Sequence, residues 1–255
     1  MVSAKKCVGG SVLLFVATVF VSLSVSSQPI KSFNVSQFTL LGCANGVPTI
    51  PLPGVPGQIP GIGTVVTPTF PPQLDQAIRA DCKEIRSKFQ VDAPVFFVME
   101  ATTPNACAVR ECVVPGTQTG TIFFGEQLLM SEFQTNQGYG VPTILAHEFA
   151  HVLQNKLGFN DGGNPMFREL HADYMAGWFT AHRARFLPQI PAASWSSVYS
   201  KGDFAFNSPQ HHGTPVQRGA CFSAGFSLNV NNNVSDAGIA YEQGKAFLRS
   251  QGAPI

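Results

Sequence analysis

Charged side chains are scarce in this sequence. Asp, Glu, Lys and Arg make up 12% of its 255 residues, and the formal net charge is +1. No run of basic residues occurs beyond Lys5-Lys6. Proteins that bind nucleic acids cluster Lys and Arg side chains to neutralise phosphates. The lack of such a cluster excludes nucleic acid from the expected partners.

Two further patterns are absent. The cysteines include no C-x-x-C pair, which argues against a zinc site built from thiolates. The chain also has no internal repeat, so a solenoid is not expected. A chain of this length is expected to form one domain, with or without appended segments. Its hydrophobic content of 44% is sufficient for a core.

Residues 1–27 have the features of a targeting segment. Lys5 and Lys6 form a basic start, residues 8–25 are almost wholly apolar or small, and small residues precede Gln28. This pattern predicts a signal peptide that is cleaved before Gln28. The apolar run is long enough that an uncleaved signal anchor is the alternative. Both outcomes predict a secreted or periplasmic location, and only the anchor would attach the chain to a membrane.

The next segment, residues 28–72, is rich in proline and glycine. Proline fixes the backbone and removes a hydrogen-bond donor, so we expect an extended segment there. The folded domain is then expected over residues 73–255.

Five cysteines follow residue 27: Cys43, Cys82, Cys107, Cys112 and Cys221. In an oxidising compartment we expect two disulfides and one free thiol among them. Cys107 and Cys112 can close a short loop and are the favoured pair. Cys43 with Cys82 is the second candidate pair, although spacing alone does not define connectivity.

Residues 147–151 read H-E-F-A-H, a complete H-E-x-x-H motif. Residues four apart lie on one face of a helix, so His147 and His151 can bind one Zn²⁺ ion together. Glu148 is adjacent to that face and can act as general base towards a water molecule. The alternative is a buried helix whose histidines form hydrogen bonds within the core.

Two histidines leave a catalytic zinc one protein ligand short. The extended motif H-E-x-x-H-x-x-G-x-x-H is excluded, because Gln154 and Leu157 replace its Gly and third His. Further along the chain, Glu169 and Asp173 lie four apart on a predicted helix. We expect Glu169 to be the third ligand and Asp173 to accept the second ring N–H of a ligating histidine. The alternative is a solvated acidic face, and His171 is expected at the surface or in second-layer packing, not as a third ligand.

Three sequence blocks together resemble a known family. They are H-E-F-A-H-V-L-Q-N-K-L-G at 147–158, E-L-H-A-D-Y-M-A-G-W-F at 169–179 and H-G-T-P-V-Q-R at 212–218. Their order is similar to that of the bacterial neutral zinc metallopeptidases, which are zincins with a glutamate ligand on a second helix. The likeness extends over about residues 95–230, and several ordered blocks are more specific than H-E-x-x-H alone.

The resemblance implies an α+β zincin-like domain with a small mixed sheet and a metal site formed by two helices. It implies that His147, His151 and Glu169 bind one zinc ion per chain. It also implies that Glu148 is the general base and that Asp173 is the partner of a ligating imidazole.

The chain departs from the family at two positions. His171 stands where the family usually has Gln, and Cys221 stands where a large aromatic residue is common. The third block places His212 just before a helix start predicted at Thr214-Pro215. From there His212 could donate a hydrogen bond to an oxyanion formed during catalysis. The alternative is that His212 only braces a loop.

The hydrophobic pattern predicts the other elements. They are helices over 73–90, 126–133, 214–226 and 235–251, and strands over 95–99 and 121–124. The resemblance assigns residues 122–125 to the sheet edge that pairs with an extended substrate, and the alternative is an ordinary core strand. Residues 188–211 are expected to form a loop over a cleft, and residues 229–233 a turn.

We therefore expect a secreted zinc peptidase acting on a peptide or protein substrate. Two alternatives remain open, namely a zinc hydrolase of a non-peptide or cell-wall amide and a secreted protein that holds zinc only to fold. Catalytic zinc sites keep an open position, whereas structural sites are closed by four protein ligands. Three ligands beside a general base favour catalysis.

Overall fold

The computed structural model describes residues 58–59, 63–66, 72–100, 104–110, 112, 119–184, 190–202 and 211–255. All of them belong to one of the two units into which the chain divides, Lys31–Ile255. The predicted signal segment and most of the Pro/Gly-rich segment lie outside the described residues. Among the residues that are described, no helix combines the length and the apolar character needed to cross a membrane.

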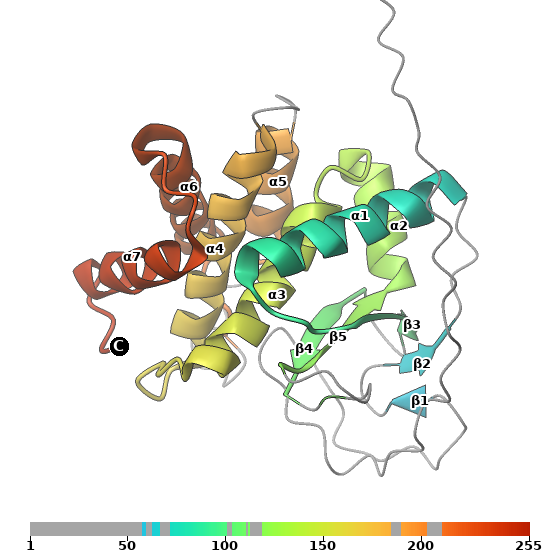
Figure 1. Cartoon of the computed structure of the whole chain (residues 1–255), viewed down its shortest axis with the longest axis horizontal. Coiled ribbons are helices and arrows are strands. Elements are labelled where there is room, and N and C mark those ends of the chain that lie inside the picture. The colour runs from blue at the N-terminus through green and yellow to red at the C-terminus, as the bar shows by residue number, and fades with distance from the viewer. Residues whose placement is uncertain are drawn as a thin grey trace, which may run out of the picture. The chain divides into compact units, whose positions relative to one another are not determined.

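A mixed five-stranded sheet lies beside the helices (Figure 1), with the strand order β1-β2-β3-β5-β4. The strands are β1 Gln58–Ile59, β2 Gly63–Val65, β3 Val95–Glu100, β4 Ala106–Val109 and β5 Thr121–Gly125. β3 and β5 are parallel, and the other neighbours are antiparallel. The small mixed sheet and the helices together confirm the predicted α+β class.

The expectation that residues 122–125 form a sheet edge is wrong. β5 is hydrogen-bonded on both sides, because Phe124 pairs with Phe97 of β3 and with Ala106 of β4. All five β5 residues are buried, so the alternative of a core strand is confirmed. β4 pairs antiparallel with β5 on the side away from β3, which places β4 last in the strand order.

Seven helices complete the described part of the chain. They are α1 Pro72–Phe89, α2 Glu126–Asn136, α3 Val141–Leu157, α4 Pro165–Ala184, α5 Ile190–Ser200, α6 Pro215–Asn232 and α7 Ala237–Ser250. α3 contacts α1, β4 and β5 as well as α4, and α6 and α7 pack on α4 in turn. In Figure 1 the group of α4, α6 and α7 lies to the left of the sheet.

Helix α3 is the helix predicted around the H-E-x-x-H motif. Its residues from Val141 to Gln154 are all buried, as expected for a helix that is mostly apolar around its circumference. Pro142 occupies the first turn, where its missing N–H is not needed. Gly158 ends the helix with a φ of 67°, a left-handed conformation that favours glycine.

Helices α4 and α6 approach each other closely through glycine. A Cβ atom at Gly177 of α4 would lie 2.0 Å from the Phe222 carbonyl oxygen, and one at Gly225 of α6 would lie 1.8 Å from the Tyr174 carbonyl oxygen. Only glycine permits such backbone contact. The close approach holds the first turns of α6 beside the middle of α4, where the site described below is formed.

Two local predictions fail. Residues 190–200 form helix α5 instead of a loop, and residues 229–232 extend α6 instead of forming a turn. In α5 the buried face is built largely from serine, with Ser194 and Ser197 both 0% exposed, so no apolar periodicity marks the helix. In α6 the amide of Asn229 is buried and donates to the Trp178 carbonyl oxygen at 3.2 Å, which satisfies a polar residue inside the core.

The predicted disulfide between Cys107 and Cys112 is also wrong, because both carry free thiols in this structure. Cys107 lies on β4 and packs in a small apolar cluster that includes Phe123. Cys112 instead accepts a hydrogen bond from a backbone N–H at 3.3 Å. Cys43 lies outside the described residues, and Cys82 on α1 is a free thiol.

Candidate metal centre

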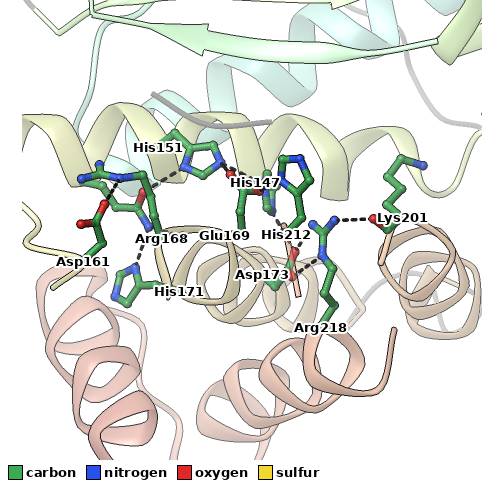
Figure 2. Close-up of polar contacts among 11 residues, drawn as sticks. His147, His151, Asp161, Arg168, Glu169, His171, Asp173, Lys201, His212 and Arg218 are labelled. Carbon is green, nitrogen blue, oxygen red and sulfur yellow. Dashed lines mark hydrogen bonds and ion pairs between the residues drawn. The ribbon is translucent and has the colours of Figure 1, made fainter. Parts of the chain in front are cut away.

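Three buried side chains from two helices meet at the interface of α3 and α4 (Figure 2). His147 and His151 come from α3 and Glu169 from α4, and they are 4%, 0% and 2% exposed. The Nε2 atom of His147 lies 3.2 Å from Glu169 Oε2 and 3.0 Å from His151 Nε2. His151 Nε2 lies 3.4 Å from Glu169 Oε1. Two imidazoles and one carboxylate that converge in this way could hold a metal ion.

The Glu169 carboxylate lies among three imidazoles. Burial raises its pKa, but His151, His147 and His212 outweigh this effect and hold the pKa well below its usual value. Glu169 is therefore ionised at neutral pH and provides the negative charge of the group.

Glu148 follows His147 on α3 and lies beside this group. Its side chain is 1% exposed, and its Oε2 atom has no hydrogen-bond partner. Burial raises the pKa of its carboxyl above the usual value, although His151 and His147 act in the opposite direction. A buried carboxylate oxygen without a partner is costly, and its presence at the wall of a cleft is typical of a functional group.

Asp173 lies one turn after Glu169 and faces His147. Its Oδ1 atom is 2.9 Å from His147 Nδ1. Arg218 of α6 donates from Nε to Asp173 Oδ2 at 2.7 Å and from Nη2 to Oδ1 at 2.8 Å. Asp173 and Arg218 are 0% and 4% exposed, so this bidentate ion pair is buried.

The pKa values of this cluster follow from its charges. Burial raises the pKa of Asp173, but Arg218 and then His147 outweigh it and hold the pKa below its usual value. Burial lowers the pKa of His147, but Asp173 and Glu169 more than offset this effect and raise it to about 9.

A second layer surrounds His151. Its Nδ1 atom lies 2.9 Å from Gln154 Oε1, and Gln154 Nε2 lies 3.1 Å from His171 Nδ1. His171 is 0% exposed, so the expectation of a surface position is wrong and the alternative of a second layer is confirmed. Burial lowers the pKa of His171 to about 4.

His212 lies directly before the first turn of α6. Thr214 caps that helix, since its side chain accepts from the Gln217 N–H and the Gln217 side chain accepts from the Thr214 N–H. His212 is 7% exposed and its Nδ1 atom lies 3.4 Å from Glu169 Oε2. The structure therefore brings His212 to the same cleft as Glu148.

The cleft extends from His147 and His212 to the sheet and to α5. Its other lining residues are Pro104, Asn105, Ala106, Leu128, Ile144, Val198, Lys201 and Arg218. Lys201 is held in place by the buried Glu132 carboxylate, whose Oε1 lies 2.7 Å from Lys201 Nζ.

Sequence reasoning assigned no role to several residues around the site. Arg218 was visible as the last residue of the H-G-T-P-V-Q-R block, and Gln154 stands three residues after His151. These positions in the sequence could have identified both residues as parts of the site. Glu132 and Lys201 come together from α2 and the end of α5, and no local pattern predicts their pairing.

Comparison with known proteins adds no assignment. No family model, no curated protein and no solved structure matches this chain. The likeness to the neutral zinc metallopeptidases remains a resemblance carried by three sequence blocks.

Proposed function

We propose that this protein is a secreted zinc-dependent peptidase with a zincin-like fold. The observation that carries the proposal is the buried Glu148 oxygen without a hydrogen-bond partner, which lines a cleft beside three converging side chains that could hold a metal ion. A general base requires this combination of acceptor capacity and access to substrate.

The donor set supports zinc. Tetrahedral zinc binds His nitrogen and carboxylate oxygen at about 2.0–2.2 Å, which places ligand atoms roughly 3.3–3.6 Å apart. The separations of 3.0, 3.2 and 3.4 Å in this group are close to that range. Within the described residues the group comprises three side chains, whereas a structural zinc site uses four. This difference supports catalysis over a purely structural ion.

When bound, zinc would lower the pKa of a coordinated water and polarise the scissile carbonyl. Glu148 would accept a proton from the attacking water and deliver it to the leaving amine. His212 would donate a hydrogen bond to the oxyanion. Asp173 would hold the proton of His147 on Nδ1, so that the Nε2 lone pair faces the ligand group.

The position of the cleft supports an extended peptide as substrate. Asn105 and Ala106 line it at the start of β4, the last strand of the described sheet order. An extended peptide can pair with a terminal strand through backbone hydrogen bonds. The apolar side chains of Leu128, Ile144 and Val198 form another wall of the same cleft, where a substrate side chain can lose contact with water.

Metal analysis combined with an assay of hydrolysis tests the proposal. The purified protein should contain about one zinc per chain and cleave a denatured protein, and a chelator should abolish cleavage until zinc is restored. Glu148→Gln preserves size but cannot accept the proton, so turnover should fall on the order of 10²-fold or more while zinc stays bound.

Other outcomes favour the alternatives. Zinc that is required for folding without hydrolysis of any amide would identify a structural ion. Cleavage restricted to cell-wall peptides or non-peptide amides would change the substrate class. Full activity of Glu148→Gln would refute the assignment of the base.

A further inference from the structure

We propose that Gln154 and His171 are positioning residues that orient His151 through a buried hydrogen-bond relay ending on helix α7. The relay runs from His151 Nδ1 to Gln154, then to His171, and ends at the Tyr241 carbonyl oxygen. The inference rests on the proposed metal site and adds the means by which its second histidine is held.

The orientation of the Gln154 amide follows from its neighbours. Its Nε2 atom lies 2.8 Å from the Arg168 carbonyl oxygen, and a carbonyl oxygen can only accept. The amide nitrogen must therefore face Arg168, since the flipped amide would bring two acceptors together. The Gln154 Oε1 atom then faces His151 Nδ1 at 2.9 Å.

This orientation determines the tautomer of His151. Because Gln154 Oε1 can only accept, His151 must carry a proton on Nδ1. The lone pair of a neutral His151 then lies on Nε2, the atom that is 3.0 Å from His147 Nε2 and 3.4 Å from Glu169 Oε1. A neutral imidazole with its lone pair directed into the ligand group is the form that binds a metal.

His171 completes the relay by fixing the other amide hydrogen. Its Nδ1 atom accepts from Gln154 Nε2 at 3.1 Å, and its Nε2–H donates to the Tyr241 carbonyl oxygen at 3.0 Å. Both nitrogens of a neutral imidazole are thereby satisfied. The ring also packs against Phe159 and Tyr241, with centroid distances of 4.7 and 4.8 Å.

Helix α7 makes room for this imidazole. A Cβ atom at Gly244 would lie 3.0 Å from both His171 Cδ2 and Nε2, and 2.9 Å from the Tyr174 ring. Glycine at this position therefore lets α7 approach His171 closely. Any larger residue would push on the ring whose hydrogen bonds hold Gln154.

The two histidines are thus oriented by different means. His147 faces the charged Asp173–Arg218 pair, whereas His151 faces a neutral amide supported by a neutral ring. Groups that orient metal-binding histidines contribute about 10–100-fold to metal affinity. We expect a contribution of that size to zinc affinity from Gln154. The contribution from His171 should be smaller, because His171 acts on His151 only through its hydrogen bond to Gln154.

The test measures zinc affinity by competition with a chelator. Gln154→Leu removes the acceptor and both donors, and should weaken zinc binding about 10–100-fold. Asn229→Leu is the matched control, because Asn229 is an equally buried amide that donates to a main-chain carbonyl away from the site. It should lower the melting temperature without changing zinc affinity.

Two variants of His171 separate positioning from simple packing. His171→Leu retains bulk but removes both hydrogen bonds, and should weaken zinc binding by less than Gln154→Leu does. His171→Gln supplies an acceptor and a donor again, and should restore most of the affinity. Equal zinc affinity in His171→Leu and His171→Gln would assign His171 a packing role only and overturn its place in the relay.

Nuclear magnetic resonance of the zinc-loaded protein gives a second readout. His151 should show a slowly exchanging Nδ1–H proton in the parent protein, and this protection should be lost in Gln154→Leu. A proton on Nε2 of His151, or unchanged zinc affinity in Gln154→Leu, would overturn the proposal. If zinc binds and the variants behave as expected but no hydrolysis occurs, only the peptidase assignment is refuted. If the parent protein does not bind zinc, both the peptidase assignment and the proposed relay are refuted.

Discussion

Replacing Arg218 with alanine should destabilise the protein strongly. Arg218 provides the cation that offsets the Asp173 carboxylate, and both side chains are almost fully buried. The substitution leaves that carboxylate in the interior with His147 as its remaining charged neighbour. It also removes the donor to the Lys201 carbonyl oxygen, which Arg218 Nη1 contacts at 3.1 Å.

The expected loss in the free energy of unfolding is about 3 kcal/mol at pH 7. Breaking a buried pair from one side costs about 3–5 kcal/mol, and the remaining contact with His147, at 2.9 Å from Asp173, favours the lower end of that range. Arg218→Met combined with Asp173→Asn should recover most of the loss, because no buried charge is then left without a partner.

Lowering the pH should reduce the difference in the free energy of unfolding between Arg218→Ala and the parent protein. In the parent, the pKa of Asp173 is held below its usual value, so Asp173 stabilises the fold above its unfolded pKa and that contribution is lost as pH falls through the folded pKa. Without Arg218, burial dominates and should raise the pKa of Asp173. Protonation of Asp173 as the pH falls then removes the buried charge that destabilises the variant.

Urea unfolding at pH 7 and pH 4.5, with a chelator present, measures both effects. Arg79→Ala is the control, because Arg79 forms an exposed ion pair with Asp75, with side-chain exposures of 63% and 33%. That pair should contribute less than about 1 kcal/mol. A loss below about 1 kcal/mol for Arg218→Ala at pH 7, or a loss that grows on acidification, would refute this account of the pair.

Three other predictions concern the site and the helices that form it. Glu169→Ala should release zinc and lower the melting temperature, as metal analysis and thermal unfolding would show; retention of zinc would exclude Glu169 as a ligand. His212→Ala should lower kcat about 10²–10³-fold with KM and zinc content nearly unchanged, while His211→Ala should have little effect; a joint fall in melting temperature and activity would indicate that His212 braces the loop. Gly225→Ala should destabilise the fold in urea, because its Cβ would lie 1.8 Å from the Tyr174 carbonyl oxygen, and an unchanged urea midpoint would contradict this close helix approach.

The core of the candidate site was predictable because it is local in sequence. His147 and His151 are four residues apart on one helix, and so are Glu169 and Asp173 on the next. A helix places such residues on one face whatever surrounds it. Most helices were also predictable from local sequence, since apolar periodicity reports which face of each element is buried, whereas the α+β class was an expectation from the family resemblance.

Contacts between distant segments were decided only by the tertiary structure. The order of the strands depends on where the chain after β3 returns, and periodicity carries no information about that return. Helix α5 was missed because its buried face contains serines. The pairing of Asp173 with Arg218 needs the glycine-mediated approach of α4 and α6, and the relay from His151 to α7 needs the packing of α7 on α4. These interactions join residues far apart in the chain, so packing between elements determines them, whereas helix geometry within a single element determines the spacing of the candidate metal-binding residues.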